Sequence, residues 1–352
     1  MLGLLSALLF PAVALACHPR VLVYTRTVGF RHPHIPIAIQ VLGEQQAKYN
    51  VTFVFSEDPN MFTDNTLKDF DGVMFVSTTD EVLDDAGQKA LANYFQSGGV
   101  YTGVHAGASC LYNDTNYVQA VGASYDYHDS LQNATFIPLI TDHPATEKIP
   151  ARWTFVEEVY TFRSDPRTNG VTVLLTVDGS SYVHDGNTTG SYPFQGEPHP
   201  IAWYNDNPYS AQPLRNGAPK AGRSFYTSLG HLNSTWFDDT FITHVMSGLR
   251  WALDGGSTKA YGVGLVGNAD PDPTSAPSSV AVTPTSAGST TQDSGSAASG
   301  ASLIASAAVS TSQAAASHKS GAADFAKTLP GGVAGAMVVV GAAAAAGFAL
   351  VL

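Results

Sequence analysis

Short apolar runs alternate with stretches of helical periodicity along the first third of the chain. Residues 21–25 and 51–55 have the β-branched and aromatic composition of strands. Residues 72–77 form an unbroken apolar run, which predicts a strand that is buried on both faces. A helix is expected between the first two strands, near residues 34–48. This alternation of strands and helices is typical of a parallel sheet with crossover helices.

The rest of the pattern is less regular. Apolar residues recur at helical spacing over residues 83–95, and a pair of glycines separates this helix from a strand at residues 100–104. Four more strands and a closing helix are expected, at residues 135–140, 171–177, 201–204, 224–228 and 238–253. Residues 179–198 and 205–221 are rich in Gly, Asn and Pro and predict loops. Together these elements predict one α/β domain over residues 17–254.

The strand at residues 100–104 leads into a turn in which glycines flank a histidine, Gly103-x-His105-x-Gly107. Such glycines let the backbone bend sharply. We expect them to hold the histidine in a strained, exposed position at the carboxyl edge of the sheet, with a helix following. Histidine at such a point can transfer a proton near neutral pH or bind a metal ion. The alternative is a histidine that is satisfied structurally and has no chemical role.

A series of short motifs runs along this domain. They are TVGFRH at 27–32, GVYTGVHAGAS at 99–109, YDYH at 125–128, DHPAT at 142–146, FVEEVYTF at 155–162, HPIAW at 199–203, GRSFYTSLGH at 222–231 and GLRWA at 248–252. In this order and spacing, over residues 21–254, they resemble the ThuA-like (trehalose-utilisation) family. The resemblance implies an α/β fold of the flavodoxin-like or class I glutamine amidotransferase-like type, a three-layer sandwich around a mostly parallel central sheet.

The resemblance also bears on the substrate. The family is linked to sugars, through trehalose utilisation and the processing of oxidised (keto) glycosides, so a carbohydrate is the expected partner. Amidotransferases of this fold carry a cysteine at the turn, whereas this chain carries His105. An imidazole cannot form the glutamyl thioester, so we do not expect glutamine hydrolysis. Cys110 lies further along, inside the expected helix, and is badly placed to substitute.

Four ionisable residues are candidates for the catalytic site. His32, His105 and His231 each follow a predicted strand, and Glu158 lies in the acidic motif shared with the family. The carboxyl ends of parallel strands open into one crevice, so we expect these side chains to converge. The first acidic position of that motif is Glu157, where the family resemblance leads us to expect an aspartate. We therefore place the functional carboxylate at Glu158.

Such a cluster allows two kinds of chemistry. In the first, His105 and Glu158 are the acid and base, supported by His32 and His231. They abstract a proton beside a keto-sugar carbonyl or protonate a leaving oxygen. In the second, the three histidines and the carboxylate bind Zn²⁺ or a similar divalent ion. The chain has no compact motif such as His-Glu-x-x-His, so the sequence favours the metal-free alternative.

Substrate contacts are expected from aromatic residues and from histidines near strand ends, because aromatic faces pack against the C–H surfaces of sugar rings. The candidates are Tyr160, Trp203, Tyr226, His128 and His199. For the aromatic residues, burial in an ordinary core is an equal alternative. The predicted function is a carbohydrate-active enzyme, a hydrolase or lyase. The rival hypothesis is a cell-surface sugar-binding module that keeps the fold without catalysis.

Both ends of the chain have features of export and anchoring. Residues 1–16 are apolar and end in Ala-Leu-Ala, which predicts a secretory signal peptide. Residues 255–320 are rich in Ser, Thr, Ala, Gly and Pro and predict a disordered, O-glycosylated stalk. In residues 321–352 a short spacer precedes a terminal apolar run, a layout typical of a GPI-attachment signal with Ser320 as the attachment site. The alternative is a transmembrane anchor.

The remaining composition fits a glycosylated surface protein. Sequons for N-glycosylation begin at Asn50, Asn113, Asn133, Asn187 and Asn233. The net charge of −12 argues against nucleic acid as a partner. The chain has only two cysteines, Cys17 and Cys110, so disulfides are not its main source of stability. The two cysteines could pair in an oxidising compartment or remain free thiols.

Overall fold

The computed structural model describes residues 18–268. The expected signal peptide at residues 1–16, Cys17, most of the stalk, and the C-terminal segment with Ser320 lie outside the described residues. Between residues 18 and 268, no helix combines the length and the apolar character needed to cross a membrane.

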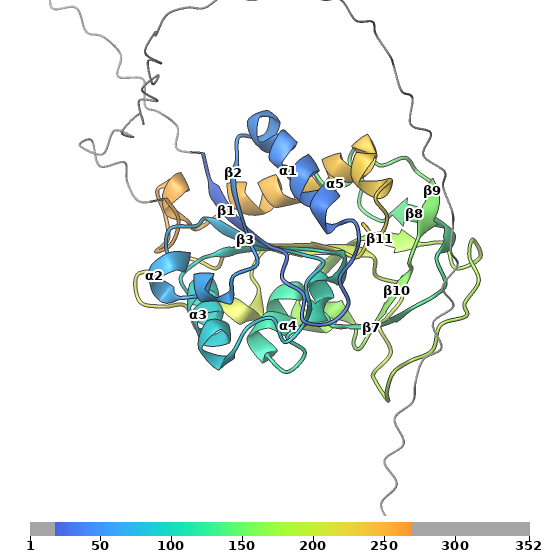
Figure 1. The fold of residues 1–352 in the computed structure, drawn as a ribbon, viewed down its shortest axis with the longest axis horizontal. Helices are drawn as coiled ribbons and strands as arrows, with labels where there is room; N and C mark the ends of the chain where they lie inside the picture. The colour runs from blue at the N-terminus through green and yellow to red at the C-terminus, as the bar shows by residue number, and fades with distance from the viewer. Residues whose placement is uncertain (1–17, 269–352) are drawn as a thin grey trace, which may run out of the picture. The chain divides into compact units, whose positions relative to one another are not determined.

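A nine-stranded sheet forms the centre of the described part of the chain, in the order β2-β1-β3-β5-β13-β12-β11-β8-β9 (Figure 1). Its strands are β1 (Arg20–Tyr24), β2 (Thr52–Ser56), β3 (Gly72–Val76), β5 (Val100–Val104), β8 (Gln132–Pro138), β9 (Trp153–Glu157), β11 (Thr172–Val177), β12 (Ala202–Asn205) and β13 (Ser224–Thr227). The first five strands in this order are parallel, and the remaining four are added antiparallel. The loops after β1, β5 and β13 therefore meet at one edge.

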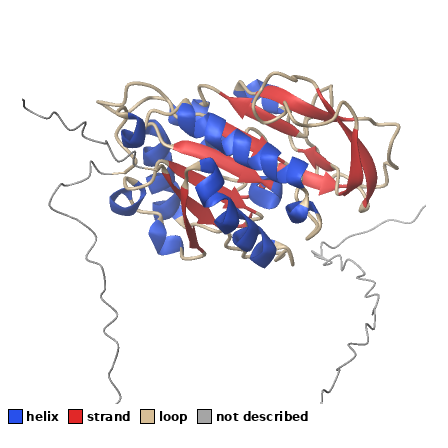
Figure 2. Cartoon of the chain, turned by 90° about the horizontal axis from the view of Figure 1, so that it is seen from above, coloured by secondary structure: helices blue, strands red, loops and turns tan. Residues whose placement is uncertain are grey.

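Helices cover both faces of the sheet, as Figures 1 and 2 show. They are α1 (Ile35–Tyr49), α2 (Asp64–Leu67), α3 (Asp85–Gln96), α4 (Thr115–Val121) and α5 (Asp239–Asp254). Two small two-stranded sheets complete the described elements. One joins β4 (Thr79–Asp80) to β6 (Ser109–Cys110), and the other joins β7 (Tyr125–His128) to β10 (Tyr160–Phe162).

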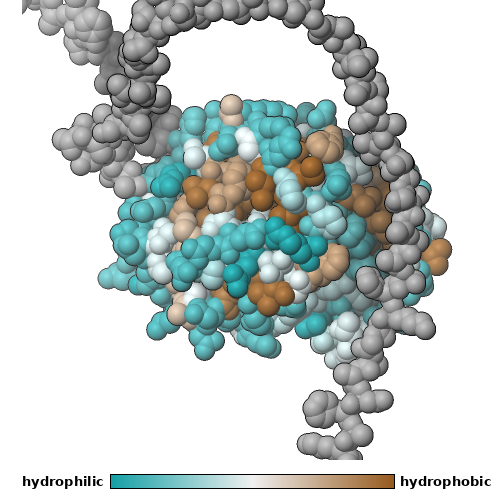
Figure 3. Space-filling model, viewed as in Figure 1, coloured by the Kyte–Doolittle hydropathy of each residue, from teal (hydrophilic) through white to brown (hydrophobic). Residues whose placement is uncertain are grey.

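Alternate residues of the parallel strands enter different cores, because successive side chains in a strand point to opposite faces. In β1, Val21 and Val23 pack with residues of α1 and α5, whereas Leu22 and Tyr24 pack with residues of α2, α3 and α4. The predicted α/β three-layer sandwich is thus confirmed, with five parallel strands on one side of its sheet and four antiparallel strands on the other. The face seen in Figure 3 is largely hydrophilic, with separate hydrophobic patches.

The helix expected after the histidine turn does not form. A single 3₁₀ turn, His105–Ala108, leads directly into β6, which pairs with β4. Cys110 therefore lies in a short strand rather than in a helix. Its thiol is buried and lies 3.1 Å from the Thr78 hydroxyl. Burial raises the pKa of Cys110 to about 12, so the thiolate needed of a nucleophile is suppressed.

The domain extends past residue 254, into residues that the composition assigned to the stalk. The Ser257 hydroxyl is buried and donates to the Gly98 carbonyl oxygen at 3.1 Å. The Leu265 N–H donates to the Ser97 carbonyl oxygen at 3.1 Å, and Val266 joins the core beside α3. Residues 255–268 thus pack on the domain. Composition alone missed this, because small polar residues are as compatible with a tight turn as with a stalk.

Two buried histidines join the last helix to the rest of the domain. His143 lies against the ring of Tyr204, with centroids 4.8 Å apart, and its Nδ1 accepts the Ala145 N–H at 3.1 Å. His244 of α5 donates from Nδ1 to the Ala145 carbonyl oxygen at 2.7 Å. The Nε2 atoms of both rings are buried without a partner. Burial lowers the pKa of each ring to about 4, so both stay neutral at pH 7.

Acid should therefore unfold this domain partly through these two rings. Their folded-state pKa of about 4 lies below the unfolded value of 6.5, so the unfolded chain binds more protons between these pH values. The free energy of unfolding should fall as the pH drops from 6.5 to 4, by up to about 3 kcal/mol per ring. Asp142 and Asp206 oppose the effect at His143, and Arg223 adds to it.

Denaturant unfolding at pH 7 and pH 5 measures the effect. His244→Gln should lose less stability over this interval than the wild type, because it has one ring fewer to protonate. His184→Gln, at an exposed position, should behave as the wild type. An equal loss of stability in His244→Gln and the wild type would contradict the assignment.

Candidate active site

Four candidate residues come together at the carboxyl edge of the parallel strands. His32 lies in the loop after β1, His105 follows β5, His231 follows β13, and Glu158 lies between β9 and β10. The structure places one donor atom of each within 4.8 Å of the others. The convergence expected from the sequence is therefore present. It requires the β1-β3-β5-β13 order, since each residue comes from a different part of the chain.

His105 is held in a strained conformation with a fixed hydrogen-bonding pattern. Its φ is +54°, in the left-handed region that residues other than glycine rarely adopt. Its Nδ1 lies 2.8 Å from the Ser228 carbonyl oxygen, which can only accept. The proton must therefore be on Nδ1, which leaves Nε2 with a lone pair. The Tyr226 hydroxyl holds the turn from behind, donating to the His105 carbonyl oxygen at 2.8 Å.

The strain expected at His105 is present, but the exposure is not. The side chain is 0% exposed, and burial with the neighbouring His32 and His34 lowers its pKa well below the usual value. The two glycines of the turn also act differently from expectation, because neither has a positive φ. A Cβ at Gly103 would lie 2.8 Å from the Tyr226 ring, and one at Gly107 would lie 2.8 Å from the Phe75 carbonyl oxygen. The glycines allow close packing, and His105 itself carries the bend.

The lone pair of His105 faces the other members of the cluster. Its Nε2 lies 3.2 Å from His32 Nε2, 3.3 Å from His231 Nδ1 and 3.0 Å from the Tyr160 hydroxyl oxygen. Glu158 Oε2 lies 3.0 Å from His231 Nδ1 and 3.8 Å from His105 Nε2. Burial raises the pKa of Tyr160 well above its usual value, so this hydroxyl keeps its proton and can donate it.

The surroundings of His32 and His231 shift the pKa values of their rings in opposite directions. Burial, and then the proximity of His34 and His231, lowers the pKa of His32 to about 3, so its ring is neutral at pH 7. Burial also lowers the pKa of His231, but the hydrogen bond and negative charge of Glu158 outweigh it and raise the pKa overall. In the absence of a cation, His231 is therefore the histidine of the cluster that best carries a proton.

Glu157 and Glu158 have different positions although they are neighbours in the sequence. Glu158 faces a cavity, and its side chain is 10% exposed. Glu157 is fully buried and accepts the backbone N–H groups of Gly230 at 2.8 Å and His231 at 3.2 Å. Burial raises the pKa of Glu157 to about 7, although these N–H groups favour its charged form. The first glutamate thus fixes the loop that carries His231, and the second is available for chemistry.

His34 is a supporting residue that sequence reasoning missed. It is 1% exposed, and its ring nitrogens lie 2.5 Å from the His231 carbonyl oxygen and 2.7 Å from the Ser77 hydroxyl. It therefore holds the His231 loop from the opposite side to Glu157. The signal available in the sequence was the His32-Pro33-His34 spacing directly after the first strand.

The cluster opens into a cavity of about 230 Å³. The lining is His32, His231, Glu158, Phe30, Tyr125, His128, Tyr160, Thr79, Ala106 and Ser109. Phe30 is 65% exposed at this cavity, and its ring meets that of His32 edge to face at 4.8 Å. His128 Nδ1 lies 2.8 Å from the Asp129 carbonyl oxygen, so it carries the proton and leaves the lone pair on Nε2. This Nε2 lies 3.5 Å from Glu158 Oε1.

Comparison with known proteins identifies the family of this chain. The family model described as ThuA, trehalose utilisation, matches residues 20–252. The chain belongs to the ThuA family. A ThuA-like protein from Bacteroides uniformis is 21% identical, with a TM-score of 0.51 over 69% of this chain and 95% of that one. Another, from Parabacteroides merdae, is 17% identical, with a TM-score of 0.48 over 67% and 90%. No curated protein matches the sequence.

Three of the substrate contacts predicted for this ThuA domain do not line the cavity. Trp203 and Tyr226 are core residues, 1% and 0% exposed, with ring centroids 4.6 Å apart. The Trp203 indole donates to the Val121 carbonyl oxygen at 2.7 Å. His199 Nε2 lies 2.8 Å from the Tyr160 carbonyl oxygen and supports that residue from behind. Tyr160 and His128 do reach the cavity.

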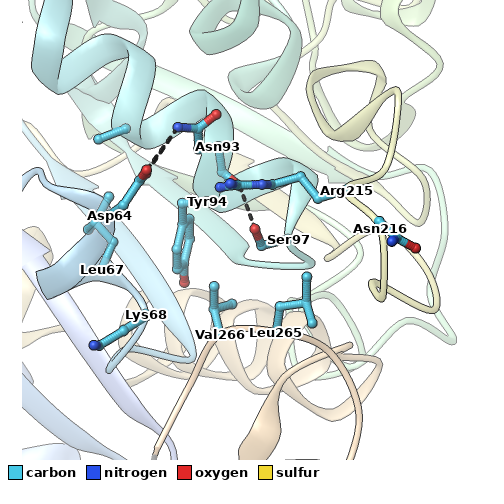
Figure 4. A pocket seen from close by; sticks show the side chains of 11 residues that line it. Asp64, Leu67, Lys68, Asn93, Tyr94, Ser97, Arg215, Asn216, Leu265 and Val266 are labelled. Atoms are coloured by element: carbon cyan, nitrogen blue, oxygen red, sulfur yellow. Dashed lines mark hydrogen bonds between the residues drawn. The ribbon is translucent and has the colours of Figure 1, made fainter.

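A second cavity of similar size lacks these chemical groups. It measures about 270 Å³ and lies between α2, α3 and the segment that includes Leu265 and Val266 (Figure 4). Its polar lining includes Asp64, which accepts a hydrogen bond from Asn93 at 3.0 Å. Its lining contains no histidine or cysteine. Of these two cavities, only the histidine cavity combines histidines with a carboxylate, and we take it as the candidate active site.

Glu157→Gln should weaken the placement of His231. A glutamine places an NH₂ group where carboxylate oxygens now accept three backbone N–H groups, so at least one buried donor loses its partner. We expect a loss of about 1–3 kcal/mol in unfolding free energy. Denaturant unfolding measures it, with the exposed Glu147→Gln as a control expected to change little. Equal stability of the two variants would show that Glu157 does not hold this loop.

Proposed function

We propose that this ThuA-family protein is a carbohydrate-active enzyme that acts on small oligosaccharides or oxidised (keto) glycosides. The observation that carries the proposal is the cavity itself. Aromatic side chains form its walls, while Glu158 and histidine nitrogens face the same space. Aromatic faces suit the C–H surface of a sugar ring, and the nitrogen and oxygen atoms suit its hydroxyl or carbonyl groups. The family description, trehalose utilisation, supports the same substrate class.

The size of the cavity favours a short substrate. Its volume of about 230 Å³ lies below the range of roughly 300–1,000 Å³ typical of sites for drug-sized ligands. One sugar ring suits such a space better than an internal segment of a polysaccharide. The substrate is therefore a monosaccharide derivative, a disaccharide or the terminal residue of a longer chain.

Two groups are suited to move a proton in this cavity. His128 donates from Nδ1 to the Asp129 carbonyl oxygen, so its Nε2 is the atom that faces Glu158, and its side chain is 38% exposed. Glu158 lies beside it and shares the cavity wall. Either could remove the acidic hydrogen next to a keto-sugar carbonyl, and the protonated form could return it to a leaving oxygen. His231, the histidine of the cluster that best carries a proton, lines this cavity and would stabilise the negative charge that develops on the carbonyl oxygen.

In this proposal His105 does not serve as the proton donor. Its ring is buried, its Nδ1 proton is committed to Ser228, and its lowered pKa keeps it neutral. Because the His105 ring stays neutral and its Nε2 faces the cluster, it can contribute a lone pair but has no proton there to donate. The acid–base role that the sequence suggested for His105 is therefore better filled by His128, with Glu158 kept as its partner.

The rival function is a sugar-binding module without catalysis. The aromatic walls suit that role as well. Against it stands the strained φ of +54° at buried His105, since such strain is costly and concentrates at functional turns. A lectin would need the walls but not this turn.

His128→Gln and Glu158→Gln should each lower turnover of a keto-glucoside by roughly 100-fold or more, because positioned acid–base groups contribute about 10²–10⁴-fold. The assay compares trehalose with its keto-oxidised derivative, using the purified chain and detecting products by mass spectrometry. His184→Gln, which is exposed, is the matched histidine control.

Full activity in both His128→Gln and Glu158→Gln would remove these residues from the mechanism. If neither trehalose nor its keto-oxidised derivative is converted, equilibrium binding of these sugars decides between the enzyme and the sugar-binding module. Binding that depends on Phe30, without product after long incubation, would support the sugar-binding module instead.

We also infer that the protein is exported, glycosylated and anchored at the cell surface. All five sequon asparagines, at positions 50, 113, 133, 187 and 233, are exposed on the domain. Exposure is required for the enzyme that attaches N-linked glycans to reach these asparagines. The composition of both termini supports the same inference.

Treatment of the protein from its native source with a peptide N-glycosidase should increase its electrophoretic mobility. A phosphatidylinositol-specific phospholipase should release it from membranes into the soluble fraction. Replacing all five asparagines with glutamine should abolish the mobility shift. Retention on membranes after phospholipase treatment and extraction only by detergent would favour the transmembrane alternative.

A further inference from the structure

We propose that His32, His105, His231 and Glu158 form a binding site for one divalent transition-metal ion, of which Zn²⁺ is the reference case. This goes beyond the proposed sugar chemistry and does not depend on it. The site follows from the direction of lone pairs, the spacing of donor atoms and the backbone groups that orient the rings. Each of these is visible without reference to a substrate.

More polar groups surround the Nε2 atom of His105 than can form hydrogen bonds with it. His105 Nε2 has one lone pair, because Nδ1 donates to Ser228. Three groups point at that lone pair: His32 Nε2, His231 Nδ1 and the Tyr160 hydroxyl. Only one can donate to it in good geometry. A cation would instead use the lone pairs of all the imidazoles at once.

His32 adds to this argument. Its Nδ1 is buried without a hydrogen-bond partner, so its only close polar contact in the described structure is through Nε2 to His105. A buried imidazole that contributes one weak contact to the protein is costly to keep. Coordination through Nε2 gives this ring a function that hydrogen bonding alone does not.

The distances between the donor atoms are close to those of a zinc coordination shell. Zn–N bonds of about 2.0 Å in a tetrahedral site place neighbouring donors about 3.3 Å apart. The separations here are 3.2 Å for His32 and His105, 3.3 Å for His105 and His231, and 3.0 Å for His231 and Glu158. The pair His105 and Glu158 is wider, at 3.8 Å, and all four donors lie within 4.8 Å. The spacing is thus close to that of a coordination shell, and slightly open.

Hydrogen bonds from residues outside the cluster orient two of the four ligands. Metal-binding histidines typically donate their second ring N–H to a carbonyl or carboxylate, which fixes the ring. His105 does this with the Ser228 carbonyl oxygen. The backbone of His231 is held on both sides, by the Glu157 carboxylate at its N–H and by His34 at its carbonyl oxygen. These contacts fix two of the four donors before any ion arrives.

The donor set selects the kind of ion. Three imidazoles and one carboxylate suit first-row transition ions, whereas Ca²⁺ and Mg²⁺ prefer oxygen ligands. The carboxylate would offset part of the charge of a divalent ion. Because His32, His231 and Glu158 line the cavity and His105 closes it from behind, the ion would be reached from the substrate side. Glu158 would bind through Oε2, and His128 would remain outside the set.

Elemental analysis by mass spectrometry tests the site directly. The purified full-length chain, handled without chelator, should contain about one equivalent of a transition metal. After chelation, titration with Zn²⁺ should restore about one equivalent and raise the melting temperature. Loading with Co²⁺ instead should give visible absorption bands of low-symmetry coordination, a signal that does not rely on activity.

Variants separate ligands from neighbours. His105→Ala, His32→Ala and Glu158→Ala should each weaken Zn²⁺ binding by roughly 100-fold or more, beyond the 10–100-fold typical of losing an outer-shell partner. His128→Gln, in the same cavity, should keep the metal while losing turnover. The exposed His184→Ala should keep both. Circular dichroism of the chelated forms shows whether each variant is folded.

Several results would overturn the site. They are no bound metal together with no rise in melting temperature on adding Zn²⁺, Co²⁺ or Mn²⁺, or unchanged binding in His105→Ala and His32→Ala. The outcomes are independent of the proposed function. Bound metal without sugar turnover would remove the enzyme proposal only, and sugar turnover by a chain that binds none of these ions would remove the metal site only.

Discussion

The hydrogen bond between His105 Nδ1 and the Ser228 carbonyl oxygen is the interaction on which the site depends. It joins the ends of two neighbouring parallel strands, β5 and β13, whose register sets Val104 opposite Thr227. Because the carbonyl can only accept, it fixes both the orientation and the tautomer of the ring. Every other group in the cluster is placed relative to the resulting lone pair. A slip of one residue in this strand pair would therefore remove the site and would also exchange the side chains of the strand between the two cores.

The strain near the site is distributed over several turns. Besides His105, the non-glycine residues Ser77, Asp80 and Leu111 have positive φ values near +50° to +60°. Ser77 follows β3 and bonds His34, while Asp80 and Leu111 flank the small β4–β6 pair next to the turn. Each such residue costs roughly 1–3 kcal/mol, which the two large cores must offset. Strain of this kind is expected where function constrains the chain.

Sequence reasoning located the parallel strands because their apolar runs are short, unbroken and bounded by polar turns. The strand at residues 100–104 matches β5 at both ends. The position of a residue was predicted less well where it depends on a contact with a residue far away in the sequence. Nothing near Trp203 shows that its indole meets Val121, and nothing near residue 257 shows that a serine there closes on Gly98. The three histidines of the cluster could be inferred from their positions after predicted parallel strands, and Glu158 from the acidic motif that resembles the family's. His34 was missed although it lies two residues after His32, because its partners His231 and Ser77 are far away in the sequence and only the fold brings them together.

The turn after β5 is placed as in enzymes that use a nucleophile there, but the structure gives it another use. A nucleophile must be exposed to its substrate, whereas His105 is buried behind His32, His231 and Glu158. The left-handed backbone at His105 turns the Nε2 lone pair of its ring inward, toward the point that the other three donor atoms face. The same backbone geometry can thus serve covalent catalysis or the presentation of a ligand. Which one results depends on the depth of the side chain and on its partner at Nδ1, rather than on the fold alone.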